Sequence, residues 1–384
     1  MNGEPLKIVV LGLSITSSWG NGHATTYRGL MRELSARGHE VLFLERNTEW
    51  YESNRDMPKP PYGRTEIYEN IEQLKERFEN DIREADCVIL GSYVPEGAVI
   101  GDWITRTAQK VKAFYDIDTP VTLANLENGD LDYLTRGLIP RYDLYLSFTG
   151  GPTLDRLEKQ LGSPMARALH CSVDPKIYYP EDHDRPWDLG YLGTYSADRQ
   201  PSVHKLLIEP AVQMPKSQFV VAGPQYPKEV HWPTNVERIT HLAPAEHRKF
   251  YGRQCFTLNV TRSEMVTAGY SPSVRMFEAA ACGTPIISDY WDGLDTFFEL
   301  GEEVLVARSG EDVLNFMLRV PREDRVEIGE LARRRVLKEH TAAHRASELE
   351  GYICELLRRP NGESDSLQAG PQESSSNLPA PFHQ

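Results

Sequence analysis

The segment from Gly269 to Asp289 carries the most informative pair of side chains in this sequence. Arg275 and Glu278 stand three residues apart, so on a helix they share one face. A guanidinium on that face can hold a phosphate through two hydrogen bonds, and a carboxylate can accept hydrogen bonds from two ribose hydroxyls. We therefore interpret the pair as the two halves of a nucleotide site. The alternative is an ordinary surface ion pair of little energetic consequence.

Local signals predict the helix that would carry this pair. Ser271 is a good N-cap, a proline follows it at the first helical position, and Gly283 comes directly after the last expected helical residue. The first free N–H groups, those of Ser273 and Val274, would point out of the start of the helix. Because a helix N-terminus stabilises an anion, we expect a diphosphate there.

The N-terminal half offers a loop of small residues and a histidine. Residues 14–23 are rich in serine, threonine and glycine, and at Gly20 and Gly22 the backbone can approach a ligand closely. The loop lacks the G-x-G-x-x-G spacing of a dinucleotide site. His23 stands where a helix is expected to begin, which favours a neutral imidazole, so it is a candidate for hydrogen bonding to a ligand or for accepting a proton. A histidine that only caps the loop is the alternative.

Two carboxylates, Asp116 and Asp118, lie in the run F-Y-D-I-D-T-P and follow an expected strand. The carboxyl ends of parallel strands form the edge of the sheet where ligands bind. We favour one of these carboxylates as a general base or as a group that orients His23. The D-x-D spacing also fits a site for a hard cation, and an Asp118 that only caps the turn is a further alternative.

An acidic loop over residues 125–136 could receive a polar second substrate. Glu127, Asp130 and Tyr133 are the residues that we expect to line it. A solvated loop without a ligand is the alternative.

The elements that must position these residues alternate between short β-rich runs and helical patterns, which indicates parallel βαβ units. In the first half the expected strands are residues 7–13, 40–45, 86–91, 112–116, 143–148 and 167–171. In the second half they are residues 188–193, 218–222, 236–240, 255–260, 284–288 and 303–307. The sequence therefore predicts an α/β fold with two Rossmann-like, doubly wound domains that face a central cleft.

The domain boundaries follow from composition. Residues 172–186 contain three prolines and many charges, so we place one domain at residues 1–172 and the next at 173–359. Residues 47–63 are rich in proline and charge, and we expect a loop near the cleft there. Residues 360–384 are almost free of large apolar side chains, which predicts a disordered tail.

Composition narrows the class of protein. The net charge of −14 opposes nonspecific binding to nucleic acid, so we expect no nucleic-acid partner. No apolar run approaches the roughly 18 residues of a membrane span, so no transmembrane segment is expected. The cysteines lack disulfide or zinc spacing, which favours a cytoplasmic protein; they are Cys87, Cys171, Cys255, Cys282 and Cys354.

A resemblance to a known family rests on the run E-A-A-A-C-G-T-P-I-I-S-D, which starts at Glu278. It is similar to the donor-binding signature E-A-x-A-C-G-x-P-V-V of the group 1 retaining glycosyltransferases with the GT-B fold. Its flanks look like the branch named for the spore maturation protein CgeB. Further similar runs are L-G-T-Y-S-A-D-R-Q-P at residues 192–201, V-A-G-P at 221–224 and F-Y-D-I-D-T-P at 114–120.

The resemblance implies roles for named residues. Glu278 would bind the donor ribose, while Arg199 and, with weaker support, Arg262 would face the diphosphate. The full set expected to bind the donor is Gly22, Thr194, Arg199, Arg262, Tyr270, Ser271, Ser273, Arg275 and Glu278. One departure from the family is Tyr270, which occupies the place of a glutamate that contacts the donor sugar. That departure leaves open which hydroxyls of the donor sugar the protein contacts and whether the transfer retains or inverts the configuration.

The implied function is a hexosyltransferase-like glycosyltransferase that moves a sugar from a nucleotide-sugar donor, UDP-linked in the family, to a hydroxyl acceptor. Three arginines and a helix N-terminus would neutralise the leaving diphosphate, so neither a metal nor another cofactor is expected. His23, Asp116 and Asp118 are the candidate catalytic residues. The family suggests a glycan or another glycoconjugate as the acceptor. A nucleotide-sugar epimerase or hydrolase and a noncatalytic sugar-nucleotide- or glycan-binding protein are the alternatives.

Overall fold

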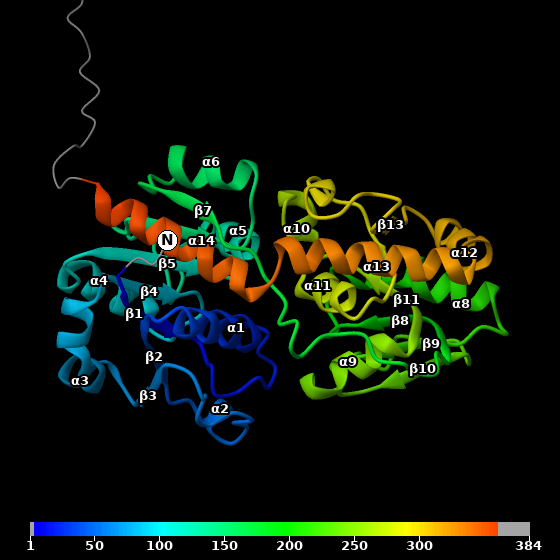
Figure 1. Cartoon of the computed structure of the whole chain (residues 1–384), viewed down its shortest axis with the longest axis horizontal. Helices are drawn as coiled ribbons and strands as arrows, with labels where there is room; N and C mark the ends of the chain where they lie inside the picture. The colour runs from blue at the N-terminus through cyan, green and yellow to red at the C-terminus, as the bar shows by residue number, and fades with distance from the viewer. Residues whose placement is uncertain (1–3, 360–384) are drawn as a thin grey trace, which may run out of the picture.

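The structure of the chain is a computed structural model, and it describes residues 4–359. It has two lobes, each built on a parallel sheet (Figure 1). This arrangement confirms the predicted α/β fold of two Rossmann-like domains.

The N-terminal sheet has seven parallel strands in the order β3-β2-β1-β4-β5-β6-β7. Its strands are β1 (Lys7–Gly12), β2 (Glu40–Arg46), β3 (Arg64–Tyr68), β4 (Cys87–Gly91), β5 (Val111–Asp116), β6 (Leu144–Ser147) and β7 (Ala166–Ala168). Strand β3 was not predicted from the sequence. It is an edge strand with mostly half-exposed residues, so it lacks the apolar run of a buried strand.

Helices cover both faces of this sheet because side chains alternate along each strand. Ile8 and Val10 of β1 pack in the same apolar cluster as α1 and α14, while Val9 and Leu11 pack with α3 and α4. The helical segments of this half are α1 (His23–Ala36), α2 (Glu49–Glu52), α3 (Ile71–Glu84), α4 (Gly97–Thr107), α5 (Thr119–Leu126), η1 (Ile139–Arg141) and α6 (Pro152–Lys159). The expected loop at residues 47–63 thus contains the short helix α2.

The C-terminal sheet has six parallel strands in the order β10-β9-β8-β11-β12-β13. Its strands are β8 (Trp187–Leu192), β9 (Phe219–Ala222), β10 (Val236–Ile239), β11 (Gln254–Asn259), β12 (Ile286–Ser288) and β13 (Leu305–Val306). Its helical segments are α7 (Gln200–Val203), η2 (His204–Ile208), α8 (Glu209–Gln213), α9 (Pro244–Gly252), α10 (Ser263–Ala268), α11 (Val274–Ala281), η3 (Leu294–Thr296), α12 (Gly310–Arg319) and α13 (Arg322–Glu339). Each strand predicted from the sequence in this half is present, with ends shifted by two residues at most.

The last helix of the described residues, α14 (Ala342–Arg358), returns to the N-terminal lobe (Figure 1). It packs along α1, where a side chain at Gly29 would meet the Cβ atom of Ala342 at 3.1 Å. Arg37 forms an ion pair with Glu350, and the hydroxyl of Tyr352 donates to the carbonyl of Ala168 over 3.2 Å. The predicted C-terminal domain, residues 173–359, is therefore wrong in one respect: its last helix packs on the N-terminal lobe.

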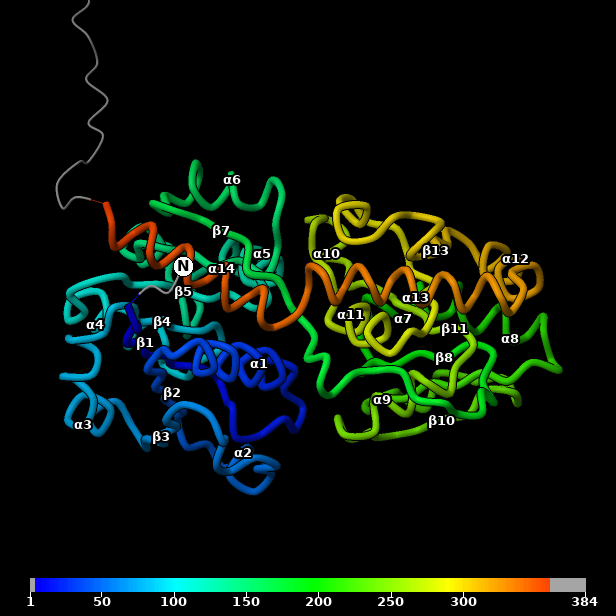
Figure 2. Tube along the Cα trace, in the orientation of Figure 1, coloured from blue at the N-terminus to red at the C-terminus, as the bar shows by residue number. Residues whose placement is uncertain are grey.

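The chain crosses between the lobes twice, and the two crossings run side by side (Figure 2). The N–H of Val173 donates to the carbonyl of His340 over 3.1 Å, and the N–H of Ala342 donates to the carbonyl of Val173 over 3.1 Å. The predicted boundary near residue 172 thus lies at one of two paired crossings.

Two further observations bear on the predictions. In residues 4–359 no helix is long and apolar enough to cross a membrane. All five cysteines are free thiols. The tail predicted at residues 360–384 lies outside the described residues.

Candidate functional site

A cleft lies between the two domains, where the carboxyl ends of both sets of strands meet. It has a main chamber of about 650 Å³ and an adjoining chamber of about 360 Å³. Residues that line both chambers include Gly20, Gly22, Thr194, Arg199 and Arg275. The cleft therefore unites several of the residues predicted for the site from both halves of the chain.

Helix α11 begins two residues later than the sequence predicts. Ser273, not Ser271, is its N-cap, and the first helical residue is Val274. The Ser273 hydroxyl donates to the side-chain oxygen of Asn259 over 2.7 Å. The N–H groups of Val274 and Arg275 have no partner within the helix, because the first turn lacks carbonyls before it. Both residues line the cleft, so the helix start that was predicted to bind an anion lies at the cleft, two residues later than expected.

Arg275 is held by the backbone and by an amide, not by a carboxylate. Its Nε donates to the carbonyl of Leu192, and Nη1 donates to the side-chain oxygen of Asn259 over 3.0 Å. Its guanidinium lies over the ring of Tyr191, 5.1 Å from the centroid. The alternative of an ion pair with Glu278 is not realised among the described residues.

Two more arginines reach the same chamber. Arg199 donates through Nη2 to the carbonyl of Thr194 over 2.7 Å, and Arg262 stands at the start of α10. Burial lowers the pKa of Arg199, and the positive charges of Arg275 and Arg262 lower it further. The Nε atoms of Arg199 and Arg262 are buried without a hydrogen-bond partner in residues 4–359. Three guanidiniums thus line one chamber, where an anion could bind.

Glu278 is buried, with 5% of its surface exposed, and lines the smaller chamber. Its Oε2 accepts from the hydroxyl of Tyr251 over 3.1 Å and lies 3.8 Å from Nδ1 of His247. Burial raises the pKa of Tyr251, and the nearby carboxylate raises it further. Sequence reasoning missed His247 and Tyr251; the available signal was their spacing of four residues on one helix, α9.

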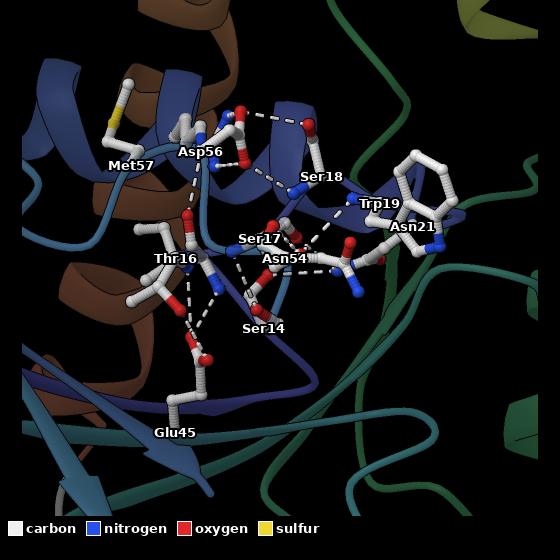
Figure 3. A network of polar contacts seen from close by, with 12 residues as sticks. Ser14, Thr16, Ser17, Ser18, Trp19, Asn21, Glu45, Asn54, Asp56 and Met57 are labelled. Carbon is white, nitrogen blue, oxygen red and sulfur yellow. Dashed lines mark hydrogen bonds and ion pairs between the residues drawn. The ribbon is translucent and has the colours of Figure 1, made fainter. Parts of the chain in front are cut away.

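On the N-terminal side, a polar network holds the loop of residues 14–22 (Figure 3). The fully buried carboxylate of Glu45 accepts from the N–H groups of Ile15 and Thr16 over 2.8 and 3.0 Å. The side-chain amide of Asn21 donates to the carbonyls of Ser14 and Ser17 over 3.2 and 3.1 Å. These bonds give the small residues of the loop a defined path.

A second anchor fixes the outer part of the same loop (Figure 3). Asp56 accepts from the N–H and hydroxyl of Ser18 over 2.8 and 2.9 Å and from both terminal nitrogens of Arg28. Burial alone would raise the pKa of Asp56, but the bonds from Arg28 and Ser18 outweigh it and lower the pKa to about 2. The adjacent Trp19 packs against His241 of the other domain, with ring centroids 4.9 Å apart.

His23 and Asp118 face each other in the main chamber. The Nε2 atom of His23 lies 3.8 Å from Oδ2 of Asp118, and both residues line the cavity. The His23 ring stands edge-on to Tyr93 with centroids 5.5 Å apart, and its backbone N–H donates to Asn21. The predicted histidine and carboxylate thus lie close together in the cleft, at a distance longer than a hydrogen bond.

Asp116 does not reach the cleft. It is fully buried, and its oxygens accept from the hydroxyls of Tyr145 and Thr122 over 2.7 and 2.8 Å. Burial raises its pKa to about 6. Only Asp118 of the D-x-D pair lines the cavity, so the structure does not support contact between Asp116 and a substrate. In residues 4–359 no group of three or more His, Cys, Asp or Glu side chains has the arrangement of a metal site.

Tyr270 and Ser271 lie at the domain interface and not among the residues that line the cleft. The carbonyl of Tyr270 accepts from the N–H of Gly150 over 3.0 Å, and its ring occupies space where a side chain at Gly151 would stand. Ser271 shares a 2.9 Å hydrogen bond with the hydroxyl of Thr149. Their predicted donor contacts are therefore replaced by contacts that join the domains.

The three residues predicted to bind an acceptor do not line the main chamber. Asp130 is exposed and accepts from the N–H of Arg136 over 3.0 Å, while Tyr133 is buried with its ring against Tyr93. Glu127 alone lines a cavity, a separate one next to the cleft, and pairs with Arg156 over 2.7 Å.

Comparisons with known proteins agree with this geometry. A family model described as glycosyl transferase-like matches residues 199–351, and no curated protein sequence matches the chain. A sucrose-phosphate synthase from Thermosynechococcus elongatus is 15% identical, with a TM-score of 0.66 over 91% of this chain and 98% of that chain. Anabaena HepE in complex with UDP-glucose is 13% identical, with a TM-score of 0.68 over 91% and 100%.

A third similar structure is an alpha-glucosyltransferase in complex with UDP-glucose and DNA containing an abasic site. It is 12% identical, with a TM-score of 0.68 over 91% of this chain and 100% of that chain. At such identities the likeness shows the fold. The chain therefore has the two-domain GT-B fold of glycosyltransferases, and residues 199–351, in its C-terminal half, match the glycosyl transferase-like family.

Proposed function

We propose that this protein is a glycosyltransferase that takes a sugar from a UDP-linked donor and passes it to a hydroxyl acceptor without a metal ion. The observation that carries the proposal is the shared cleft. On one wall a buried carboxylate, Glu278, lies near Arg275 and the start of α11; on the other wall His23 faces Asp118. The family match and the similar structures solved in complex with UDP or UDP-glucose support it.

The donor would lie across the C-terminal wall. Glu278, whose Oε2 accepts from the hydroxyl of Tyr251, would accept from the ribose hydroxyls, while the diphosphate would sit at the N–H groups of Val274 and Arg275. The guanidiniums of Arg199 and Arg262 would complete the anion site. Separation of the diphosphate from the sugar builds negative charge, and these fixed donors stabilise it most at that stage.

The acceptor hydroxyl would approach from the N-terminal wall. His23 and Asp118, 3.8 Å apart, would orient the hydroxyl that attacks the anomeric carbon, and one of them would accept its proton. Asp116 takes no direct part in this scheme; it fixes the turn that leads to Asp118 through a 3.3 Å bond from that residue's N–H.

The donor site is tested by thermal shift with UDP-, GDP- and dTDP-sugars in the presence of EDTA. One nucleotide sugar should raise the midpoint of the wild type and fail to do so for Glu278→Ala. Loss of a charge-assisted pair of hydrogen bonds, worth about 1.5–3 kcal/mol each, should weaken binding by at least about tenfold. The exposed neighbour variant Glu246→Ala, one residue from His247 on the same helix, is the matched control.

Either of two results would contradict the proposed site: no nucleotide sugar binds the wild type, or binding disappears when EDTA is added.

Product analysis then separates a transferase from the alternative classes of protein. A transferase forms a new glycoside with an added acceptor, a hydrolase releases free sugar, an epimerase returns an altered nucleotide sugar, and a binding protein leaves the donor unchanged.

A further inference from the structure

A separate cavity of about 470 Å³ lies beside the cleft, between the two domains. Helices α5 and α6 form its N-terminal wall, and α10 forms its C-terminal wall. Residues of all three helices line it, among them Leu123, Pro152 and Ala268. No residue that lines the cavity also lines either chamber of the cleft.

The interior of this cavity is suited to an apolar group. Leu123 and the short side chains of Pro120, Ala124, Pro152 and Ala268 supply much of the wall. On the N-terminal wall Glu127 and Arg156 pair with each other, and on the C-terminal wall the carboxylate of Glu264 accepts from the hydroxyl of Ser263. The lining contains no aromatic side chain, so it offers no flat platform for a sugar ring.

The cavity and the cleft are built on the same two elements. Asp118 caps α5 and lines the cleft, and Pro120, two residues later, lines the cavity. On the opposite wall Met265 of α10 lines the cleft, whereas Thr267 and Ala268 line the cavity. The two spaces thus adjoin the same ends of α5 and α10, and a molecule with its reacting hydroxyl near Asp118 would reach the cavity past the start of α5.

We propose that the cavity holds an apolar aglycone of the acceptor, so that the acceptor is an amphiphilic glycoside whose sugar lies at His23 and Asp118. This inference rests on the proposed function, because it assigns the second substrate of the same site. The apolar group would gain free energy from burial, while the hydroxyl is placed by the polar cleft.

The test uses the full-length protein and the donor that stabilises it. Transfer rates are measured for glucose, galactose, mannose and N-acetylglucosamine, each beside its octyl glycoside below the micelle-forming concentration. At least one octyl glycoside should have a kcat/KM about tenfold or more above that of its free sugar. Ala124→Trp, which fills the cavity from an exposed position of α5, should remove this preference. Asn125→Trp, at the exposed next residue outside the cavity, should retain it.

Equal rates within every pair, or no transfer to any pair while the donor is hydrolysed, would overturn the inference. So would an octyl preference that survives in Ala124→Trp. Absence of donor binding and of donor hydrolysis would instead contradict the proposed function itself. The preference is the ratio of kcat/KM for the octyl glycoside to kcat/KM for the free sugar, both measured on one protein sample. Partial unfolding of a variant lowers both values equally and so leaves this ratio unchanged.

Discussion

Replacement of Asp116 by asparagine should change how the stability of the protein depends on pH. The carboxylate is fully buried, and burial raises its pKa from 3.8 to about 6 in the folded protein. The hydroxyls of Tyr145 and Thr122 donate to it, but these hydrogen bonds do not offset the cost of removing the charged carboxylate from water. Asparagine has nearly the same shape and does not titrate, so the comparison isolates this one proton.

The sign follows from proton binding. Between pH 3.8 and 6 the folded state holds the proton of Asp116 and the unfolded state does not, so stability falls as the pH rises through this window. A difference of about two pKa units corresponds to about 3 kcal/mol. The contribution is fully present below the unfolded pKa and is lost above pH 6.

Urea denaturation of the wild type and of Asp116→Asn from pH 4 to 7.5 measures the contribution of this proton to the free energy of unfolding. The free energy of unfolding of the wild type minus that of the variant should increase by about 3 kcal/mol as the pH falls across the window. The same series in 1 M salt should give nearly the same increase, because burial and not a distant charge is the cause. A difference that stays constant with pH, or that decreases as the pH falls, would refute the reasoning.

Three further results are expected. Arg199→Ala should reduce kcat/KM for the donor by at least about tenfold, because one guanidinium of the anion site is lost; unchanged steady-state kinetics would exclude it from the site. Asp56→Ala should speed amide hydrogen exchange at Ser18 and raise the KM for the donor, and equal exchange in both proteins would show that the anchor is dispensable. Gly29→Leu should destabilise the protein by about 1–3 kcal/mol in urea, because its Cβ atom meets Ala342 at 3.1 Å; full stability would mean that α14 can shift freely.

Much of the fold could be predicted because buried parallel strands have a strong local signal. The run Lys7–Gly12 is apolar and buried apart from its first residue, and the run Phe219–Ala222 is apolar and buried throughout. Strand β3 has no such run, since an edge strand needs apolar side chains at fewer positions. The return of α14 to the first lobe was missed because an apolar helix face does not specify which surface it covers.

The donor half of the site was also largely accessible from the sequence. Glu278 and Arg275 belong to one short segment, whose helical spacing fixes their relative placement. The start of α11 could not be predicted to the residue, because Ser271 forms a hydrogen bond with Thr149 of the other domain and does not cap the helix. The roles of Asp116 and Tyr251 depend likewise on partners far away in the chain.

The position of α14 has a consequence for the order in which the protein is made. The strands of the first sheet are complete once Ala168 has left the ribosome, but the helix that covers α1 is the last helix of residues 4–359. Until α14 is made, the surface around Gly29 lacks the cover that Ala342 gives it. The first lobe must therefore wait for the whole second lobe before its packing is finished. A nascent chain stalled in the second lobe would accordingly present an exposed apolar face from the first, which makes such chains targets for chaperones or for aggregation.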